Sequence, residues 1–275
     1  MARLSGAELA GGGVASVTCP RPVTPAITFD NVAIQRRGRM VWSKATFSIK
    51  RGERVALLGP NGSGKTTMLR VILGQLTPTV GRVTVLGSPP QAGNRAIGLV
   101  PQRRELVSDI TIRSRDLVLL GINGYRWGFG RAHPEELRQM SRALQAVGAL
   151  DFADEPVGSL SGGQQQRVFI AQALVDDVQV LLLDEPLASL DLKSQHEIVA
   201  LISAIHQSRG VTTVIVTHDL NPIISSIDRV LYILDGHPRC GSIADVVNAD
   251  LLSRLYGTAI HVLRTADGEL FIRGA

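Results

Sequence analysis

Residues 59–66 have the types and spacing that could bind phosphate groups. They match the pattern G-x-x-x-x-G-K-[ST], follow an apolar strand-like run and open a predicted helix, which disfavours the alternative of an ordinary glycine turn. Glycines let backbone N–H groups converge on phosphate oxygens, and a helix N-terminus adds partial positive charge. Lys65 could reach the β- and γ-phosphates of a nucleotide, and the Thr66 hydroxyl could bind Mg²⁺. The candidate phosphate-binding residues are Gly59, Pro60, Asn61, Gly62, Ser63, Gly64, Lys65, Thr66 and Thr67.

Two acidic residues, Asp184 and Glu185, end the apolar run 180–183. Ligands in open α/β sheets sit at the carboxyl ends of the strands. Asp184 would help to hold Mg²⁺, and Glu185 would orient or deprotonate an attacking water, so that loss of its carboxylate should remove catalysis and spare nucleotide binding. An acidic pair after a strand is often only a helix N-cap, but the phosphate loop in the same chain disfavours that alternative.

A second glycine pair, Gly162 and Gly163, stands in the sequence LSGGQ at residues 160–164, before a predicted helix. This is a second candidate anion-binding helix N-terminus. Together the three elements resemble the ATP-binding cassette (ABC) family, whose signature sequence LSGGQ is matched letter for letter. The resemblance covers about residues 26–241. It implies that Ser161, Gly162, Gly163 and Gln164 contact ATP, and that the cofactors are ATP and Mg²⁺.

The resemblance also gives roles to single residues. Gln102 resembles the glutamine that touches Mg²⁺ and the attacking water, and His218 resembles the histidine that contacts the γ-phosphate. Residues 189–191 look like the loop that communicates between subunits. One departure is clear, because residues 35–38 lack the aromatic residue that usually stacks on adenine. Arg36 or Arg37 could replace it through a cation–π contact, with a relaxed preference for ATP over GTP.

The pattern of the remaining elements predicts the fold. Strand-like runs at 55–58, 180–184, 211–217 and 229–235 alternate with helical spacing and predict a parallel sheet covered by helices. Shorter alternating runs at 27–29 and 46–49 predict a small antiparallel sheet. The pattern therefore predicts an α/β fold with a small antiparallel β subdomain and an inserted helical subdomain, and the family resemblance implies that the core is a P-loop NTPase (RecA-like) core. In the helical insert we expect a core-facing stripe of Leu137, Met140, Leu144 and Val147.

The expected organisation has three parts: a flexible N-terminal tail at 1–25, an ABC ATPase domain at 26–241 with its helical insert at about 102–164, and a C-terminal extension at 242–275. The residue pattern of the extension predicts one hairpin around Asp267 and Gly268, and the sequence indicates no function for this hairpin.

Composition and residue spacing indicate which kinds of partner to expect. The chain has 275 residues and a formal net charge of +5, and its 25 Arg are spread along the chain, which favours a solvated surface over a nucleic-acid partner. The longest apolar runs fall far short of the roughly 20 residues of a membrane-spanning helix. Cys19 and Cys240 have no metal-ligand spacing and fit reduced thiols in a cytosolic compartment. The six histidines have no ligand spacing either, so we expect any transported metal to bind partner proteins.

The resemblance implies three kinds of partner at the cytoplasmic face of the cell membrane: a second cassette in a head-to-tail homodimer, multi-span permease subunits and an extracytoplasmic substrate-binding protein. The permease would dock beside Arg103, Arg104 and Glu105. Residues 100–104, 217–222 and 251–257 look most like cassettes of manganese, zinc or iron importers. The alternative is a soluble ABC ATPase of an assembly system, whereas a P-loop kinase or GTPase outside the family would leave residues 160–164 unexplained.

Overall fold

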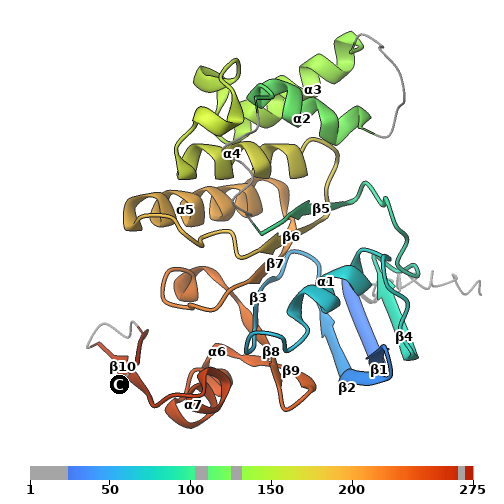
Figure 1. Ribbon diagram of the computed structural model, residues 1–275, viewed down its shortest axis with the longest axis vertical. Coiled ribbons are helices and arrows are strands. Elements are labelled where there is room, and N and C mark those ends of the chain that lie inside the picture. The colour runs from blue at the N-terminus through green and yellow to red at the C-terminus, as the bar shows by residue number, and fades with distance from the viewer. Residues whose placement is uncertain (1–23, 103–110, 125–131, 266–269, 275) are drawn as a thin grey trace, which may run out of the picture.

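A six-stranded sheet forms the centre of the molecule. The structure is a computed structural model that describes residues 24–102, 111–124, 132–265 and 270–274 (Figure 1). The strand order is β5-β6-β7-β3-β8-β9, and all neighbours are parallel except β8 and β9. β6 and β7 are buried along their whole length, as continuous apolar runs in a parallel sheet should be. These strands are β3 (Arg54–Leu58), β5 (Ile97–Val100), β6 (Val180–Asp184), β7 (Thr212–Val216), β8 (Arg229–Leu234) and β9 (His237–Ser242).

A second, three-stranded antiparallel sheet confirms the predicted β subdomain. Its order is β2-β1-β4, with β1 at Ile27–Arg36, β2 at Arg39–Ile49 and β4 at Val80–Val85. β1 and β2 are longer than the sequence runs indicated. The sheet and helix α1 (Lys65–Ile72) enclose one core, in which Phe29 and Trp42 are almost fully buried. This core contains residues of both β3 and α1, the two elements that the phosphate loop connects.

The inserted helical region lies at one end of the molecule (Figure 1). It contains α2 (Ser114–Asn123), α3 (Pro134–Ala146), the 3₁₀ turns η2 (Leu150–Phe152) and η3 (Val157–Ser159), and the start of α4 (Gly162–Ala173). The expected stripe on α3 is partly wrong: Leu144 and Val147 are buried, but Leu137 is 44% exposed. The inward position in the first turn belongs instead to Glu136, whose side chain accepts a hydrogen bond from the His133 N–H and caps the helix.

The C-terminal elements pack on the core cluster of the central sheet. Helix α5 (Leu192–Arg209) buries Ile198, Ile202 and Ile205, while Leu201 is half-buried. The later elements are η4 (Ile224–Ser226), α6 (Ile243–Val246), α7 (Ala249–Tyr256), β10 (Ile260–Arg264) and β11 (Leu270–Gly274). β10 and β11 form the predicted antiparallel hairpin, although its turn at 267–268 lies outside the described residues. Leu252, Leu255 and Ile260 join the core cluster, so the extension continues the same core.

Candidate active site

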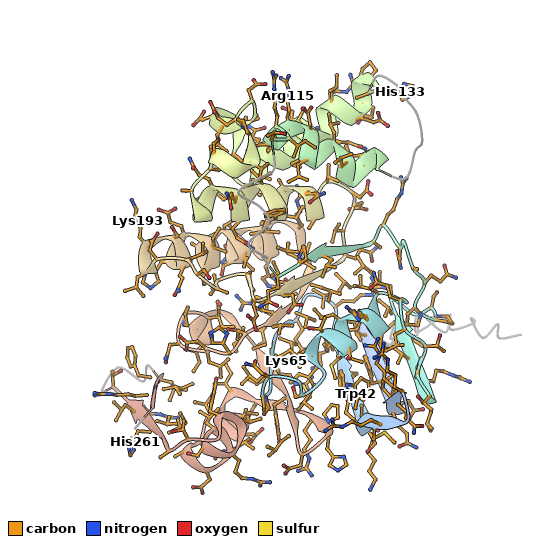
Figure 2. All side chains as sticks on the ribbon, viewed as in Figure 1. Trp42, Lys65, Arg115, His133, Lys193 and His261 are labelled. Atoms are coloured by element: carbon orange, nitrogen blue, oxygen red, sulfur yellow. The ribbon has the colours of Figure 1, made fainter. Side chains whose placement is uncertain are left out.

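The loop between β3 and α1 has the backbone that phosphate binding requires. Helix α1 begins at Lys65, and Gly64 caps it with φ = 99°, a left-handed conformation that favours glycine. A Cβ atom at Gly64 would also lie 2.6 Å from Val41 Cγ1 and 2.9 Å from Trp42 Nε1. Only glycine therefore fits where β2 packs against the helix N-terminus. Figure 2 labels Lys65 and Trp42 on these two adjoining elements.

Lys65 is held against its own loop. Its Nζ donates hydrogen bonds to the carbonyl oxygens of Gly59, at 2.7 Å, and Pro60, at 3.1 Å. Burial lowers the pKa of Lys65, and the negative charges of Glu185 and Asp184 oppose that shift. The ammonium group thus lies in the field of both carboxylates that follow β6.

Asp184 and Glu185 occupy the carboxyl end of β6, as predicted. Burial raises the pKa of Asp184, the charge of Glu185 raises it further, and Lys65 opposes both. Glu185 has φ = 51°, which is uncommon for a residue with a side chain, and its N–H donates to the Val216 carbonyl at 3.0 Å. This left-handed turn directs the chain out of the sheet immediately after β6.

Two predicted polar residues converge on the Glu185 carboxylate. The Gln102 amide Nε2 donates a 2.8 Å hydrogen bond to Glu185 Oε2, and His218 Nδ1 lies 3.9 Å from the same oxygen. The three residues follow β5, β6 and β7, which are neighbours in the sheet. Strand order therefore brings together residues that are up to 116 positions apart in sequence.

A cavity of about 560 Å³ opens over the phosphate loop. Thr66, Gln102 and Asp184 line it and carry hydroxyl, amide and carboxylate oxygens, a donor set that fits Mg²⁺. Within the described part of the chain, no group of three or more His, Cys, Asp or Glu could hold a metal by itself, so these oxygens would need further ligands from phosphate or water. The cavity is lined by Arg36, Val41, Asn61, Gly62, Gly64, Lys65, Thr66, Thr67, Gln102, Asp184 and Glu185.

Arg36 lines this cavity and Arg37 does not. Arg36 ends β1, and Arg37 has φ = 49° in the turn to β2. None of the described lining residues is aromatic, which agrees with the missing stacking residue. Of the two arginines considered from sequence, Arg36 is therefore the one that lines the cavity over the phosphate loop.

The signature residues form a separate helix N-terminus. Ser161 caps α4: its Oγ accepts from the Gln164 N–H at 3.4 Å, and Gln164 Oε1 accepts from the Ser161 N–H at 2.9 Å. Gln164 thus folds back on the helix start. Figure 1 shows α4 well apart from α1, and Ser161, Gly162, Gly163 and Gln164 are not among the described residues that line the 560 Å³ cavity.

A second cavity, of about 300 Å³, adjoins Glu185 and is lined mainly by residues that follow β6 and β7. Ser189, Thr217, His218 and Asp219 line it together with Glu185. Ser189 has φ = 62°, so the segment after β6 contains two left-handed turns four residues apart. Ser189, in the segment that resembles the loop communicating between subunits, and His218 therefore line the same cavity.

The structure thus brings most of the predicted site residues together at the carboxyl ends of neighbouring strands in the central sheet. Arg103, Arg104 and Glu105, the expected permease contacts, lie outside the described residues. Sequence reasoning missed Val41, which lines the cavity, and Trp42, which packs on Gly64; both lie on a strand whose start the sequence did not indicate. Their only sequence signal was an apolar pair after a predicted turn.

The fold and the phosphate loop define a P-loop NTPase. The family model described as ABC transporter matches residues 42–188, and the chain belongs to this family. It is therefore an ATP-binding, ATP-hydrolysing cassette. In the described residues no helix is both long and apolar enough to cross a membrane.

Relatives and solved structures agree with this assignment. The chain is 34% identical over 249 residues to the zinc transport system ATP-binding protein TroB of Treponema pallidum, covering 90% of this chain and 91% of TroB. It is 32% identical over 234 residues to the manganese transport system ATP-binding protein MntB of Halalkalibacterium halodurans, covering 85% and 93%. A putative metal-chelate type ABC transporter in an inward-facing conformation has a TM-score of 0.78 at 25% identity, covering 92% and 97%. These likenesses support the transporter interpretation over the soluble assembly ATPase.

Proposed function

We propose that this chain hydrolyses Mg²⁺–ATP as a head-to-tail homodimer and drives the uptake of a divalent metal ion, manganese, zinc or iron, through separate membrane subunits. The similarity to TroB and MntB supports the substrate class. The distance in the fold between the signature residues and the phosphate loop supports the dimer, because a second chain is then needed to bring Ser161, Gly162 and Gly163 over the nucleotide.

In the proposed site the phosphate loop binds the nucleotide through its backbone N–H groups and Lys65. Lys65 would exchange its hydrogen bonds to Gly59 and Pro60 for hydrogen bonds to phosphate oxygens. Thr66, Gln102 and Asp184 would hold Mg²⁺, which neutralises phosphate charge when bound. Arg36 would lie against the base.

Hydrolysis requires a water in line with the γ-phosphate. Glu185 would orient this water and accept its proton, and the hydrogen bond from Gln102 would keep the carboxylate in one orientation. His218 would contact the γ-phosphate beside the same carboxylate. Closure of the partner's signature helix would complete the pocket, and phosphate release would allow the dimer to reopen.

Several features of the complex follow as part of the proposal. The cassette would lie at the cytoplasmic face of the cell membrane, with the helical insert against multi-span permease subunits and a substrate-binding protein on the other side. The proposed domain bounds are 26–241 for the ATPase and 242–275 for the extension. The transported metal would bind the partner proteins.

Metal uptake in cells tests this function directly. A strain lacking the gene should lose uptake of one radiolabelled ion among Mn²⁺, Zn²⁺ and Fe²⁺, and a plasmid copy of the wild-type gene should restore it. The Glu185→Gln copy should not restore uptake, although its protein should still copurify with a multi-span membrane protein. Normal uptake of all three ions in the deletion strain would contradict the metal-import proposal.

A further inference from the structure

The C-terminal hairpin is attached to the loop that carries His218. The Asn221 side chain donates from Nδ2 to the Ile272 carbonyl at 2.8 Å and accepts at Oδ1 from the Ile272 N–H at 2.8 Å. One amide side chain thus satisfies both backbone groups of a residue in β11. Asn221 lies only three residues after His218, and 51 residues separate it from Ile272.

The register of the hairpin shows why Ile272 is available for this contact. Ile272 faces Val262 across the β10–β11 ladder. Antiparallel pairs alternate between hydrogen-bonded and non-hydrogen-bonded, and the backbone groups of one residue point to one side. Since both groups of Ile272 bond Asn221, they point away from β10. Asn221 therefore extends the hairpin as a third strand would, and a two-stranded hairpin gains from such support.

Local hydrogen bonds brace the loop that carries His218, residues 217–221. At the β7 end, Thr217 Oγ1 donates to the Asp219 carbonyl at 2.7 Å and accepts from the Asp219 N–H at 3.1 Å. At the other end, the Asn221 N–H donates to Asp219 Oδ1 at 2.9 Å. Short local bonds therefore connect the backbone of His218 to Asn221, and a shift of Asn221 would move His218.

A charge on the same loop also influences the C-terminal elements. Tyr256, in the last turn of α7, is partly buried against the core, and its pKa is raised to about 12 by burial and by the nearby charge of Asp219. Asp219 and Asn221 are thus both next to segments beyond residue 249. The buried side chain of Leu220 anchors the loop to the core between them.

We propose that Asn221 is a positioning residue for ATP hydrolysis: by tying the His218 loop to strand β11, it holds His218 against the γ-phosphate and makes turnover depend on the C-terminal hairpin. This inference rests on the proposed contact of His218 with that phosphate. The proposal gives the C-terminal extension a function, because a displacement of β11 would move Asn221 and, three residues away, His218.

The test uses the full-length chain with Asn221→Leu, which keeps the side-chain size and removes both hydrogen bonds. Since a misplacement of 1 Å can cost about 100-fold, we expect kcat to fall about 10-fold, with KM for ATP within about 2-fold of wild type. Because Leu220 still anchors the loop, Tm should change little. An unchanged kcat, or a fall of kcat in proportion to a lost folded fraction, would overturn the proposal.

Asn248→Leu is the matched control. Asn248 also makes two side-chain hydrogen bonds to backbone, from Nδ2 to the Asp245 carbonyl and from the Leu251 N–H to Oδ1, but it caps α7 and does not contact the His218 loop. This variant should lower Tm and leave kcat unchanged. An equal loss of kcat in both variants would mean that the C-terminal elements act only through general stability.

A double-mutant cycle with His218→Ala separates this proposal from the function on which it rests. If Asn221 acts through His218, Asn221→Leu should cause no further loss in the His218→Ala background. A further loss as large as in the wild-type background would overturn the positioning role. A wild-type rate in His218→Ala alone would instead contradict the role given to His218.

Discussion

The Gln102 amide donates a 2.8 Å hydrogen bond to the Glu185 carboxylate, which joins the end of β5 to the end of β6. Gln102 lies two residues after β5, on the chain segment that leads from the central sheet to the helical region containing α2. The hydrogen bond therefore joins the carboxylate proposed to activate water to the segment between the sheet and the helical region.

Replacement of Glu185 separates hydrolysis from binding. Glu185→Gln keeps the acceptor oxygen for Gln102 but removes the base, so we expect kcat to fall at least about 100-fold. ATP affinity should stay near the wild-type value, because Lys65 and the phosphate loop are untouched. Turnover assays and binding of a fluorescent ATP analogue measure the two effects.

Glu197→Gln is the control for this prediction, since Glu197 is a half-exposed carboxylate whose ion pair with Arg167 lies outside the cavity. It should leave both kcat and affinity unchanged. Full hydrolysis by the Glu185→Gln protein would remove Glu185 from the proposed mechanism.

Arg36 and Arg37 form a matched pair for base recognition, because only Arg36 lines the cavity. A cation–π contact is worth about 0.5 to 2 kcal/mol, so Arg36→Ala should weaken ATP binding by about 2- to 30-fold, and more for one base than for the other. Arg37→Ala should have no effect. Titrations with ATP and GTP check both variants, and an equal loss for the two nucleotides, or no loss, would refute base stacking.

Gly64 should tolerate no side chain. Gly64→Ala would bring a Cβ to 2.6 Å from Val41 in a left-handed backbone, so we expect a stability loss of about 1–3 kcal/mol and loss of ATP binding. Gly93→Ala is the control, because Gly93 has φ = 76° and open space around its Cβ position. Chemical denaturation should show a smaller loss for Gly93→Ala, with ATP binding retained. Similar losses in both variants would mean that backbone strain alone, and not the contact with β2, restricts Gly64.

Asp184→Asn should stabilise the nucleotide-free protein. The pKa of Asp184 is raised in the folded state, so the protonated form is favoured there, and its contribution to stability is lost as pH rises through that pKa. The Tm of Asp184→Asn should therefore exceed that of wild type at pH 7, and the difference should vanish below pH 3.8, the ordinary value. ATP hydrolysis should be lost at every pH.

Asp191→Asn is the control, because the pKa of Asp191 is shifted in the opposite direction to that of Asp184. Backbone and side-chain hydrogen bonds from Ser194 lower the pKa of Asp191, so removal of its charge should give no stabilisation at pH 7. A Tm gain for Asp191→Asn equal to that for Asp184→Asn would show that the effect does not come from the buried position of Asp184.

The sequence predicted the parts of this molecule in which local pattern and chemistry coincide. The phosphate loop, the acidic end of β6 and the capped start of α4 each combine a distinctive residue set with a strand or helix boundary, and the structure has all three elements at these positions. Leu137 was misjudged because apolar periodicity does not reveal that Glu136 turns inward to cap α3. Contacts between distant segments, such as Trp42 on Gly64 and Asn221 on Ile272, depend on packing and have no local signal.

The head-to-tail dimer is tested most directly by mixing two inactive variants. Lys65→Ala removes the phosphate loop's cation, and Ser161→Arg blocks the signature helix, so each homodimer should be inactive. In a mixed dimer one pocket combines two defects and the other is intact, so random pairing should restore about one quarter of the wild-type rate. No activity above that of the separate variants, or full activity of Ser161→Arg alone, would contradict a pocket shared between two chains.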